Sequence, residues 1–462
     1  MMWDINLENV PFETDVRELL MAFYPEGSEV HVSGRCTDTE YTLSVAFPDE
    51  GGTREFSCSR LQDRFAEKCE IKKKLYGILS EHEGKTLPWG TLTGIRPTKL
   101  AMQGIDFKEV FLTSDEKIKL CFETAAREEK ILRKIDYEKG WSLYIGIPFC
   151  PTRCLYCSFT AYPVSLWKDR KKDYIDALCR EIEAVSEMMS DKKLQTVYMG
   201  GGTPTSLEAE ELERIIETVR RCNDMSSVLE FTVEAGRPDS ITEDKLAVLK
   251  KCGVSRISVN PQSMNQKTLD LIGRRHTVED VREKFRLARA LGFDNINMDI
   301  ITGLPGETVQ DVENTMDELE KLGPDDITVH TLAVKRAARL SEERELYEPA
   351  AFETMCAMTE LTAKRCRQMG LKPYYLYRQK NMAGNFENVG YSREDKEGIY
   401  NILIMEEKQI IAGCGAGTTT KIPVDGGAGG VHRIENVKDP QIYIDRIEEM
   451  IERKRKINDG TY

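Results

Sequence analysis

The sequence predicts an α/β fold: a partial (β/α)6 barrel, preceded by an α+β accessory domain and followed by a small C-terminal α+β region. From about residue 142 onward, six short segments rich in β-branched residues alternate with charged segments of helical period. Strands that return roughly every 30 residues, with helices between them, are typical of right-handed βαβ units and a parallel sheet. Six such units are too few for a closed eight-fold barrel, which favours an open one. An ordinary doubly wound sheet would produce the same pattern.

The elements of this barrel follow from local patterns. One helix shows its period clearly, because Leu212, Ile215 and Val219 recur at three- and four-residue steps. In a barrel of this kind the chemistry lies at the C-terminal ends of the strands, so we expect the functional site there. The predicted strands are 142–148, 196–201, 228–235, 256–261, 295–303 and 326–334, and the predicted helices are 167–189, 206–221, 242–252, 278–291 and 307–322.

The flanking regions have other patterns. Before the barrel, 29–36 and 41–47 alternate as an antiparallel pair of strands would, 61–83 and 114–134 have helical period, and 88–100 is rich in turn formers. After Gly370, glycine clusters separate strand-like runs that include 399–405 and 409–412, and a helix at 441–455 closes the chain. We therefore expect an accessory domain at 1–139, the barrel at 140–372 and a substrate-covering region at 373–462.

The composition excludes several classes of protein. The chain has 462 residues, with 65 Lys and Arg against 78 Asp and Glu, and a net charge of −13. This balance argues against a nucleic-acid-binding surface, which needs clustered Lys and Arg. No apolar stretch approaches the ~18 residues of a membrane span, and the first residues lack the basic and apolar parts of a signal peptide. We expect a cytoplasmic protein with no nucleic-acid partner and no membrane span.

Three of the thirteen cysteines stand together. Cys150, Cys154 and Cys157 have the spacing C-x3-C-x2-C directly after the first barrel strand, whereas the other ten are scattered singly. Three thiolates in one short loop can hold three corners of a cubane iron–sulfur cluster, which leaves the fourth iron open to a ligand. A zinc ion, or a closed cluster with a remote fourth ligand, is the alternative interpretation.

Further short motifs follow the cysteine loop in order along the chain. They are YIGIPFC at 144–150, MGGGTPT at 199–205, TVEAGRPD at 232–239, SVNPQS at 258–263, IGRRHT at 272–277, NMDIITGLPGET at 297–308 and HTLAV at 330–334. On these motifs the chain resembles the radical S-adenosylmethionine (SAM) superfamily, and within it the oxygen-independent coproporphyrinogen III oxidase group. EAGRPD, with TLTGIRPTKL upstream and GNFENVGYS downstream, resembles the HemZ-type coproporphyrinogen dehydrogenases of that group.

The resemblance implies two cofactors, a [4Fe-4S] cluster on the three cysteines and SAM at its open iron. It assigns the ribose of SAM to Glu234, a carboxylate at the end of an apolar strand, where a salt bridge is the other interpretation. Arg274, with Arg275 as an adjacent alternative, is expected on the SAM carboxylate or the substrate side. Glycines at the end of the second strand let the backbone approach a small ligand. The remaining expected SAM contacts are Tyr144, Gly201, Gly202, Thr203, Gln262, Asp299, Ile301 and Ala333.

The reaction that the resemblance implies is the oxidative decarboxylation of coproporphyrinogen III to protoporphyrinogen IX. An electron from a flavodoxin or ferredoxin cleaves SAM, and the 5′-deoxyadenosyl radical removes a propionate β-hydrogen. Loss of CO2 and of one further electron then gives a vinyl group. The tetrapyrrole substrate carries four carboxylates, which basic side chains could clamp. Lys335, Arg336, Arg339, Arg378 and Lys380 are candidates, and a solvated charged face is the alternative interpretation of these residues.

Two positions depart from the best-studied members of the group. Phe159 stands where those members carry a fourth cysteine, and Gly146 stands in place of a histidine. The haem-chaperone branch also lacks the fourth cysteine, so a haem-binding chaperone is the second hypothesis, with His276 and His330 as candidate axial ligands. Another radical reaction on a tetrapyrrole is the third.

Overall fold

The structure is a computed structural model, and it describes residues 4–24, 29–159, 161–335, 337–342, 347, 350–379, 386–424, 426 and 429–459. The chain divides into two compact units. One comprises Met1–Ala126 and Leu376–Asn388, and the other comprises Arg127–Tyr375 and Val389–Tyr462. Arg336 and Lys380, two of the candidate propionate ligands, lie outside the described residues.

The first unit is built on a four-stranded sheet in the order β1-β2-β3-β4. Strands β2 and β3 pair antiparallel, as their alternating patterns predict, whereas β1 pairs parallel to β2. The long helix α2 begins where the Asp63 carboxylate accepts the amide of Phe65, and it ends at the left-handed Gly84. The elements of this region are β1 (Asp4–Glu8), α1 (Glu13–Phe23), β2 (His31–Cys36), β3 (Glu40–Ala46), β4 (Thr53–Ser59), α2 (Arg64–Glu83), α3 (Pro97–Met102), α4 (Phe107–Phe111) and α5 (Asp115–Leu132).

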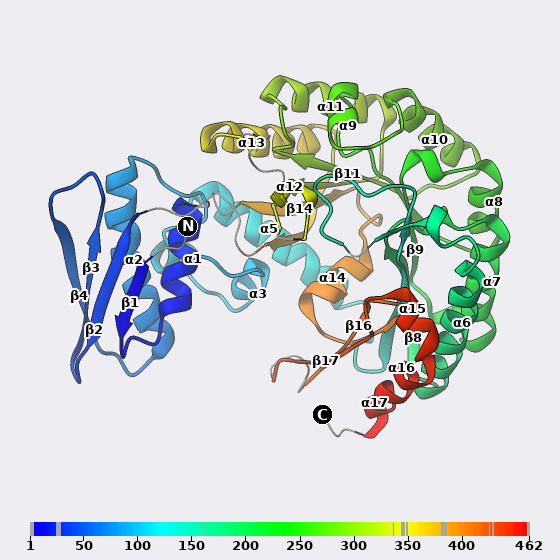
Figure 1. Ribbon diagram of the computed structural model, residues 1–462, viewed down its shortest axis with the longest axis horizontal. Helices are drawn as coiled ribbons and strands as arrows, with labels where there is room; N and C mark the ends of the chain where they lie inside the picture. The colour runs from blue at the N-terminus through cyan, green and yellow to red at the C-terminus, as the bar shows by residue number, and fades with distance from the viewer. Residues whose placement is uncertain are drawn as a thin grey trace. The chain divides into compact units, whose positions relative to one another are not determined.

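The second unit contains the predicted open barrel. All six predicted strands form, and they are parallel neighbours in chain order. Figure 1 shows their helices in an arc along one side of the sheet. The strands are β5 (Gly140–Ile147), β8 (Lys193–Gly201), β9 (Glu230–Gly236), β10 (Arg256–Val259), β11 (Ile296–Thr302) and β12 (Asp326–Thr331).

The helices of the barrel follow the predicted periods closely. They are α6 (Lys171–Met188), α7 (Ala209–Cys222), α8 (Glu243–Lys251), α10 (Val278–Ala290) and α11 (Val309–Leu322), with the short α9 (Gln266–Leu271) between α8 and α10. Three of them begin with a capping box, at Glu208, Thr277 and Thr308. The apolar faces of these helices are buried, as Leu212, Ile215 and Val219 illustrate with no exposed surface.

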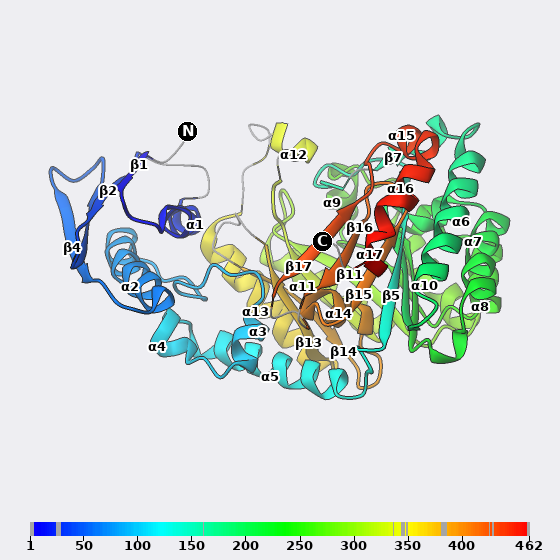
Figure 2. The ribbon, with the colours of Figure 1, turned by 90° about the horizontal axis from the view of Figure 1, so that it is seen from below.

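The C-terminal part of the chain extends this sheet at both ends. The full sheet has 11 strands in the order β13-β14-β12-β11-β10-β9-β8-β5-β15-β16-β17. Figure 2 shows β15, β16 and β17 beside β5. The remaining elements are β6 (Phe149–Cys150), β7 (Tyr162–Pro163), α12 (Arg339–Glu342), α13 (Phe352–Gln368), β13 (Lys372–Arg378), β14 (Glu387–Ser392), α14 (Ile399–Glu406), β15 (Ile410–Cys414), β16 (Thr419–Pro423), β17 (Val431–Glu435), α15 (Pro440–Asp445), α16 (Ile447–Lys454) and α17 (Lys456–Asp459).

Two predicted C-terminal elements are wrong. The segment 399–405 reads as a strand because it is rich in Ile and Leu, yet it forms helix α14. The carboxylate of Glu230 accepts the amides of Ile399 and Tyr400 at the start of this helix, a tertiary contact that local propensity does not reveal. The predicted helix 441–455 is divided into α15 and α16 at Arg446. No helix within the described parts of the chain is long and apolar enough to cross a membrane.

Candidate functional site: the cysteine loop and the barrel interior

The three clustered cysteines lie in one short loop after strand β5. Cys150 ends β6, and the amide of Cys157 donates to the carbonyl of Cys154 at 3.2 Å. The loop is tied to two other segments, because the amide of Leu155 donates to the carbonyl of Ile272 at 3.0 Å and its carbonyl accepts the amide of Leu340 at 2.9 Å. The segments after α9 and β12 therefore hold the loop in place.

Two buried guanidinium groups flank the cysteine loop. Arg237 donates to the backbone and side-chain oxygens of Thr152 at 2.9 and 2.7 Å and lies 3.9 Å from the sulfur of Cys154. Arg274 donates to the carbonyl of Asn260 at 2.6 Å and to the hydroxyl of Tyr156 at 3.3 Å. Both groups place positive charge beside thiols that bind metal only as thiolates.

The chemistry of this loop fits an iron–sulfur cluster. Burial raises the pKa of the Cys150 thiol to about 11, so the thiolate needs a cation beside it, which a cluster supplies. Within the described residues no three His, Cys, Asp or Glu side chains converge as they would on a single metal ion. A cubane takes each cysteine at a separate iron, so its ligands need not converge on one point.

The glycines that end β8 pack the strand tightly against the cysteine-bearing segment. The amides of Gly202 and Thr203 donate to the carbonyls of Ile147 and Phe149, each at 2.7 Å. A Cβ at Gly202 would lie 2.5 Å from the Phe149 carbonyl oxygen, closer than any side chain tolerates. The Thr203 hydroxyl lies 3.4 Å from the Cys150 sulfur. We call this close contact of Gly202 and Thr203 with the 147–149 backbone the glycine cradle. A residue larger than glycine would fill it, and it brings the end of β8 directly to the cysteine loop.

Polar side chains line one face of the six parallel strands. Alternate residues of a strand share a face, so Tyr144, Tyr198, Glu234 and Asp299 belong to one face together with the residues two positions away. Each of these four is partly buried and keeps some exposed surface. The same face also carries Ser142, Thr196, Glu230, Thr232, Arg256, Ser258, Asn297, Asp326, Thr328 and His330.

Glu234 is the carboxylate nearest the glycine cradle. Its Oε1 accepts the hydroxyl of Tyr198 at 2.5 Å. Burial raises the pKa of Glu234 to about 7, the Tyr198 hydrogen bond opposes that rise, and the charge of Asp299 adds to it. Among the described residues no Arg or Lys forms a salt bridge with Glu234, and its short side-chain hydrogen bond comes from the Tyr198 hydroxyl. The carboxylate is therefore not consumed by an ion pair.

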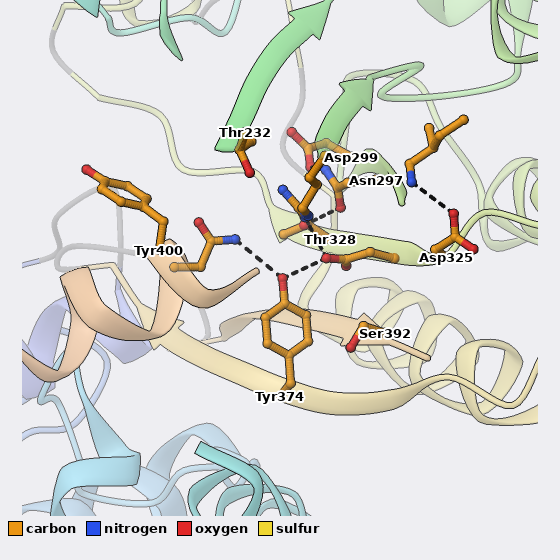
Figure 3. Close-up of polar contacts among 12 residues, drawn as sticks. Thr232, Asn297, Asp299, Asp325, Thr328, Tyr374, Ser392 and Tyr400 are labelled. Atoms are coloured by element: carbon orange, nitrogen blue, oxygen red, sulfur yellow. Dashed lines mark hydrogen bonds and ion pairs between the residues drawn. The ribbon is translucent and has the colours of Figure 1, made fainter. Parts of the chain in front are cut away.

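Asp299 lies within β11, and Gln262, which follows the end of β10, donates its amide to the Asp299 carbonyl at 2.9 Å. Asn260 and Asn297 each donate to a carboxylate oxygen of Asp299 at 2.7 Å, and the His330 ring lies 3.9 Å away. Burial by itself would raise the pKa of Asp299, but the hydrogen bonds from His330 and Asn297 leave it below its usual value. Figure 3 shows Asn297, Asp299 and Thr328 side by side. Gln262 has φ = 67°, a left-handed conformation that is uncommon for a non-glycine residue and clusters at functional sites.

The other predicted SAM contacts differ in how they are buried. Ile301 belongs to a buried apolar cluster that also contains Leu155 and Ile272, so it packs under the cysteine loop. Ala333 lies partly buried on the segment that follows β12. Of the two adjacent arginines, Arg274 is the buried one beside the loop and Arg275 is exposed.

The structure also places the residues of the rival interpretations. His276 has 1% exposed surface and both ring nitrogens lack a hydrogen-bond partner, and burial lowers its pKa to about 4. In this conformation it cannot reach a haem iron, whereas His330 retains exposed surface in the barrel. Gly146 has a structural cause, because a Cβ there would lie 2.5 Å from the Thr418 methyl.

The candidate propionate ligands differ among themselves. Lys335 and Arg339 are exposed. Arg378 belongs to the other compact unit, is 2% exposed, and donates to the carbonyl of Leu92 at 2.6 Å over the ring of Trp89. Burial lowers its pKa to about 9. The interpretation of Arg378 as part of a solvated charged face is therefore wrong, since its guanidinium is enclosed by its own unit.

Sequence reasoning missed three residues of this region. Arg237 is signalled by the motif EAGRPD, in which a buried arginine follows the strand carrying Glu234. Tyr198 and Tyr400 carry no signal of their own, because a tyrosine in an apolar strand or helix resembles core. Their positions become visible only when the barrel brings β8 and α14 together.

Comparisons with known proteins agree with this geometry. The Radical SAM superfamily model matches residues 144–319. The chain is 45% identical over 394 residues to the oxygen-independent coproporphyrinogen-III oxidase-like protein HemZ of Bacillus subtilis, covering 82% of this chain and 78% of that protein. It is 32% identical over 312 residues to the heme chaperone HemW of the same organism, covering 67% of this chain and 76% of HemW.

A solved structure shares the fold. The coproporphyrinogen III oxidase HemN from Escherichia coli, described as a radical SAM enzyme, superimposes with a TM-score of 0.56 at 21% identity, over 71% of this chain and 73% of HemN. The predicted partial barrel is thereby confirmed. Taken with the identity to HemZ over most of the sequence, these matches establish that the chain belongs to the radical SAM superfamily, in the family of HemZ-like, oxygen-independent coproporphyrinogen-III oxidase-like proteins.

Proposed function

We propose that this protein catalyses the oxidative decarboxylation of coproporphyrinogen III to protoporphyrinogen IX in anaerobic haem biosynthesis. The observation that carries the proposal is a three-cysteine loop at the mouth of a polar barrel, in a chain 45% identical to a coproporphyrinogen-III oxidase-like protein. The family uses a [4Fe-4S] cluster and SAM, which when bound supply a 5′-deoxyadenosyl radical through one-electron cleavage of SAM. A flavodoxin or ferredoxin is the proposed electron donor.

Different residues of the chain are proposed to bind the cluster and SAM. Cys150, Cys154 and Cys157 would each hold one iron of the cluster, which would leave the fourth iron for SAM. Glu234 would accept hydrogen bonds from the ribose diol, and Arg274 would lie on the side of the SAM carboxylate or of the substrate. The other proposed SAM contacts are Tyr144, Gly201, Gly202, Thr203, Gln262, Asp299, Ile301 and Ala333.

The chain also controls the surroundings of the reaction. Arg237 and Arg274 keep the cysteine loop in one conformation through their bonds to Thr152, Tyr156 and Asn260. The apolar cluster around Ile301 includes Leu155 of that loop and limits the access of water and oxygen. Lys335 and Arg339 follow β12 with exposed side chains and are the proposed partners of substrate propionates.

A haem chaperone is the second candidate. The 32% identity to HemW and the Phe159 that replaces a fourth cysteine favour it. In this reading His330 is the available ring for a haem iron, because His276 is enclosed.

One anaerobic experiment separates the two functions. The reconstituted protein is mixed with SAM, a low-potential reductant and coproporphyrinogen III, and the products are quantified by mass. Formation of one 5′-deoxyadenosine and one CO2 for each new vinyl group supports the decarboxylase, and the Cys150→Ala variant is the control. Stoichiometric haem binding, with deoxyadenosine no higher than the uncoupled background when coproporphyrinogen is present, contradicts it and supports the chaperone.

A further inference from the structure

Three tyrosine rings from distant parts of the chain stack inside the barrel. The rings of Tyr144 on β5, Tyr198 on β8 and Tyr400 on α14 form a triangle in which each ring contacts the other two, with the Tyr144 and Tyr400 centroids 6.1 Å apart. The Tyr198 and Tyr400 centroids are 4.5 Å apart with an interplanar angle of 24°, and the Tyr144 and Tyr198 centroids are 6.0 Å apart with an angle of 14°. The contacts with the Tyr400 and Tyr144 rings restrict the rotation of the Tyr198 ring about its side-chain bonds.

The hydroxyl at the end of this fixed ring is bonded to Glu234. Tyr198 Oη lies 2.5 Å from Glu234 Oε1, in the range of a strong bond to a carboxylate. Gly200 makes the approach possible, because a Cβ there would lie 2.9 Å from both Glu234 Cδ and Tyr198 Cε1. The backbone of Gly201 also acts to lower the pKa of this carboxylate. Strand β8 therefore sets the orientation of a side chain that belongs to β9.

Helix α14 completes this arrangement from the C-terminal part of the chain. Glu230, four residues before Glu234 on β9, accepts the amide of Ile399 at 2.5 Å and that of Tyr400 at 3.4 Å. Thr232 donates to Glu230 at 2.9 Å and fixes that carboxylate in turn. Figure 3 shows Tyr400 on its helix near the strand that carries Thr232. The helix is thus docked on the same strand whose functional carboxylate its tyrosine supports.

We propose that Tyr198, held by Tyr400 of helix α14, is a positioning residue that fixes the Glu234 carboxylate to receive the ribose hydroxyls of SAM. The inference rests on the proposed assignment of Glu234 to the ribose. It makes a helix that lies outside the matched superfamily segment, residues 144–319, part of the cofactor site.

The charged and polar groups around Glu234 set its pKa, so a role of Tyr198 should be visible in the pH dependence of SAM binding. The groups that face this carboxylate are Tyr198 on β8, Asp299 on β11 and Arg256 on β10, together with Tyr144, Tyr400 and Glu230. Burial raises the pKa of Glu234 to about 7, and the bond from Tyr198 is the largest influence that lowers it. Removing the hydroxyl therefore raises this pKa further, so the ionised carboxylate that accepts both ribose hydroxyls forms only at higher pH.

The test measures SAM binding by the cluster-loaded protein, by anaerobic equilibrium dialysis between pH 6 and 9. Tyr198→Phe is expected to weaken SAM binding about tenfold at pH 7 and to move the pH at which affinity rises upward. Its iron and sulfide contents are expected to match the unmodified protein. It is also expected to lose part of the preference for SAM over an analogue without the ribose 2′-hydroxyl, which a merely structural role would not affect.

Matched variants keep the result interpretable. Tyr41→Phe removes another buried Tyr–Glu bond, 3.0 Å long to Glu67 in the other compact unit, and is expected to leave SAM binding unchanged. Tyr400→Ala removes the supporting ring and is expected to resemble Tyr198→Phe, whereas Tyr400→Phe keeps the ring and is expected to bind as the unmodified protein does. This pair gives a result even where Tyr198→Phe folds poorly.

The outcomes separate the inference from the function on which it rests. If Glu234→Gln binds SAM normally, the assignment of Glu234 to the ribose is wrong and the inference falls with it. If Glu234→Gln weakens binding but Tyr198→Phe and Tyr400→Ala do not, Tyr198 is not a positioning residue. If the binding pattern appears but no vinyl product forms from coproporphyrinogen, the inference stands and the proposed decarboxylation fails.

Discussion

Two buried carboxylates of the second unit show how differently the fold treats a structural and a functional acid. Glu181 on α6 has no exposed surface and receives the Gly415 amide at 2.7 Å, the Asn436 amide nitrogen at 2.8 Å and the Tyr443 hydroxyl at 2.6 Å. The ammonium of Lys454 is bonded to it as well. Glu234 keeps exposed surface and has one short side-chain bond. Glu181, whose hydrogen-bonding capacity is filled, holds neighbouring segments together, whereas Glu234 keeps part of its carboxylate free for a ligand.

The difference matters because incomplete pairing costs stability. A protein keeps a partly solvated carboxylate with a raised pKa in its interior only when the surrounding structure offsets that cost. The Glu181 network, which joins α6 to α15, α16 and the turn after β15, is placed to do this on the outer side of the sheet. The comparison can be tested by substitutions in the Glu181 network or at Glu234.

The largest effect is expected from the Glu181 network. Lys454→Met removes the cation and leaves a buried, uncompensated carboxylate, so the free energy of unfolding in urea should fall by about 3–5 kcal/mol. Lys456→Met, on an exposed side chain two residues away, is the control and should change it by less than about 0.5 kcal/mol. A loss below about 1 kcal/mol for Lys454→Met would mean that this network does not stabilise the unit.

The next effect is expected where the surroundings of Glu181 meet the cysteine loop. The ring of Phe149 packs 5.2 Å from that of Tyr174, next to Tyr443 of the Glu181 network, while the Phe149 carbonyl binds the end of β8. Gly202→Ala places a methyl group 2.5 Å from that carbonyl oxygen. Overpacking of this kind costs about 1–3 kcal/mol, and we expect a parallel loss of bound iron because the cysteine loop moves.

The matched change for this prediction is Gly77→Ala in helix α2. An added Cβ there meets nothing within 4 Å, so the helix should gain about 0.5–1 kcal/mol. Equal iron contents in Gly202→Ala and the unmodified protein, measured after anaerobic reconstitution, would show that the close contact does not position the loop.

A smaller effect of opposite sign is expected at Glu234. Its pKa is raised from 4.5 to about 7, so the folded state binds a proton that the unfolded state has released, and stability falls as the pH rises through this window. Glu234→Gln removes the dependence, and we expect it to stabilise the protein by about 1 kcal/mol at pH 7.5, with little difference below pH 4.5. Glu210→Gln on the exposed surface of α7 should show no such pH-dependent gain. A Glu234→Gln variant less stable than the unmodified protein at pH 7.5 would place Glu234 among the structural acids.

Much of the barrel could be predicted from the sequence, and the reason is local. Strands β5, β8, β9, β10, β11 and β12 are short β-branched runs between amphipathic helices, so each element carries its own signal. Helix α14 could not be predicted, because its apolar sequence also suits a strand and its start is fixed by Glu230, some 169 residues earlier in the chain. Tertiary contacts of this range leave no periodic pattern.

In the site, too, the residues with a local sequence signal could be predicted and those that depend on tertiary contacts could not. The three cysteines and the glycines after β8 could be predicted because their spacing and composition are unusual. Tyr198 and Tyr400 could not, since a tyrosine acquires its function here only through the partner at its hydroxyl or beside its ring. Arg274 and Arg275 were equivalent in the sequence, and burial alone distinguishes them.

That distinction predicts the smallest effect of all for Arg275, the exposed member of the pair. Arg275 is exposed, so Arg275→Ala should change the free energy of unfolding by less than about 0.5 kcal/mol and leave SAM binding and iron content as they are. Arg274→Ala removes the donor to the Asn260 carbonyl and to the Tyr156 hydroxyl, and it takes a positive charge from beside Cys154. We expect it to cost about 2–3 kcal/mol and to lower the iron retained under chelator. Because the two residues are adjacent and identical in type, equal losses of iron in both variants would show that the net charge near the loop matters and the buried contacts of Arg274 do not.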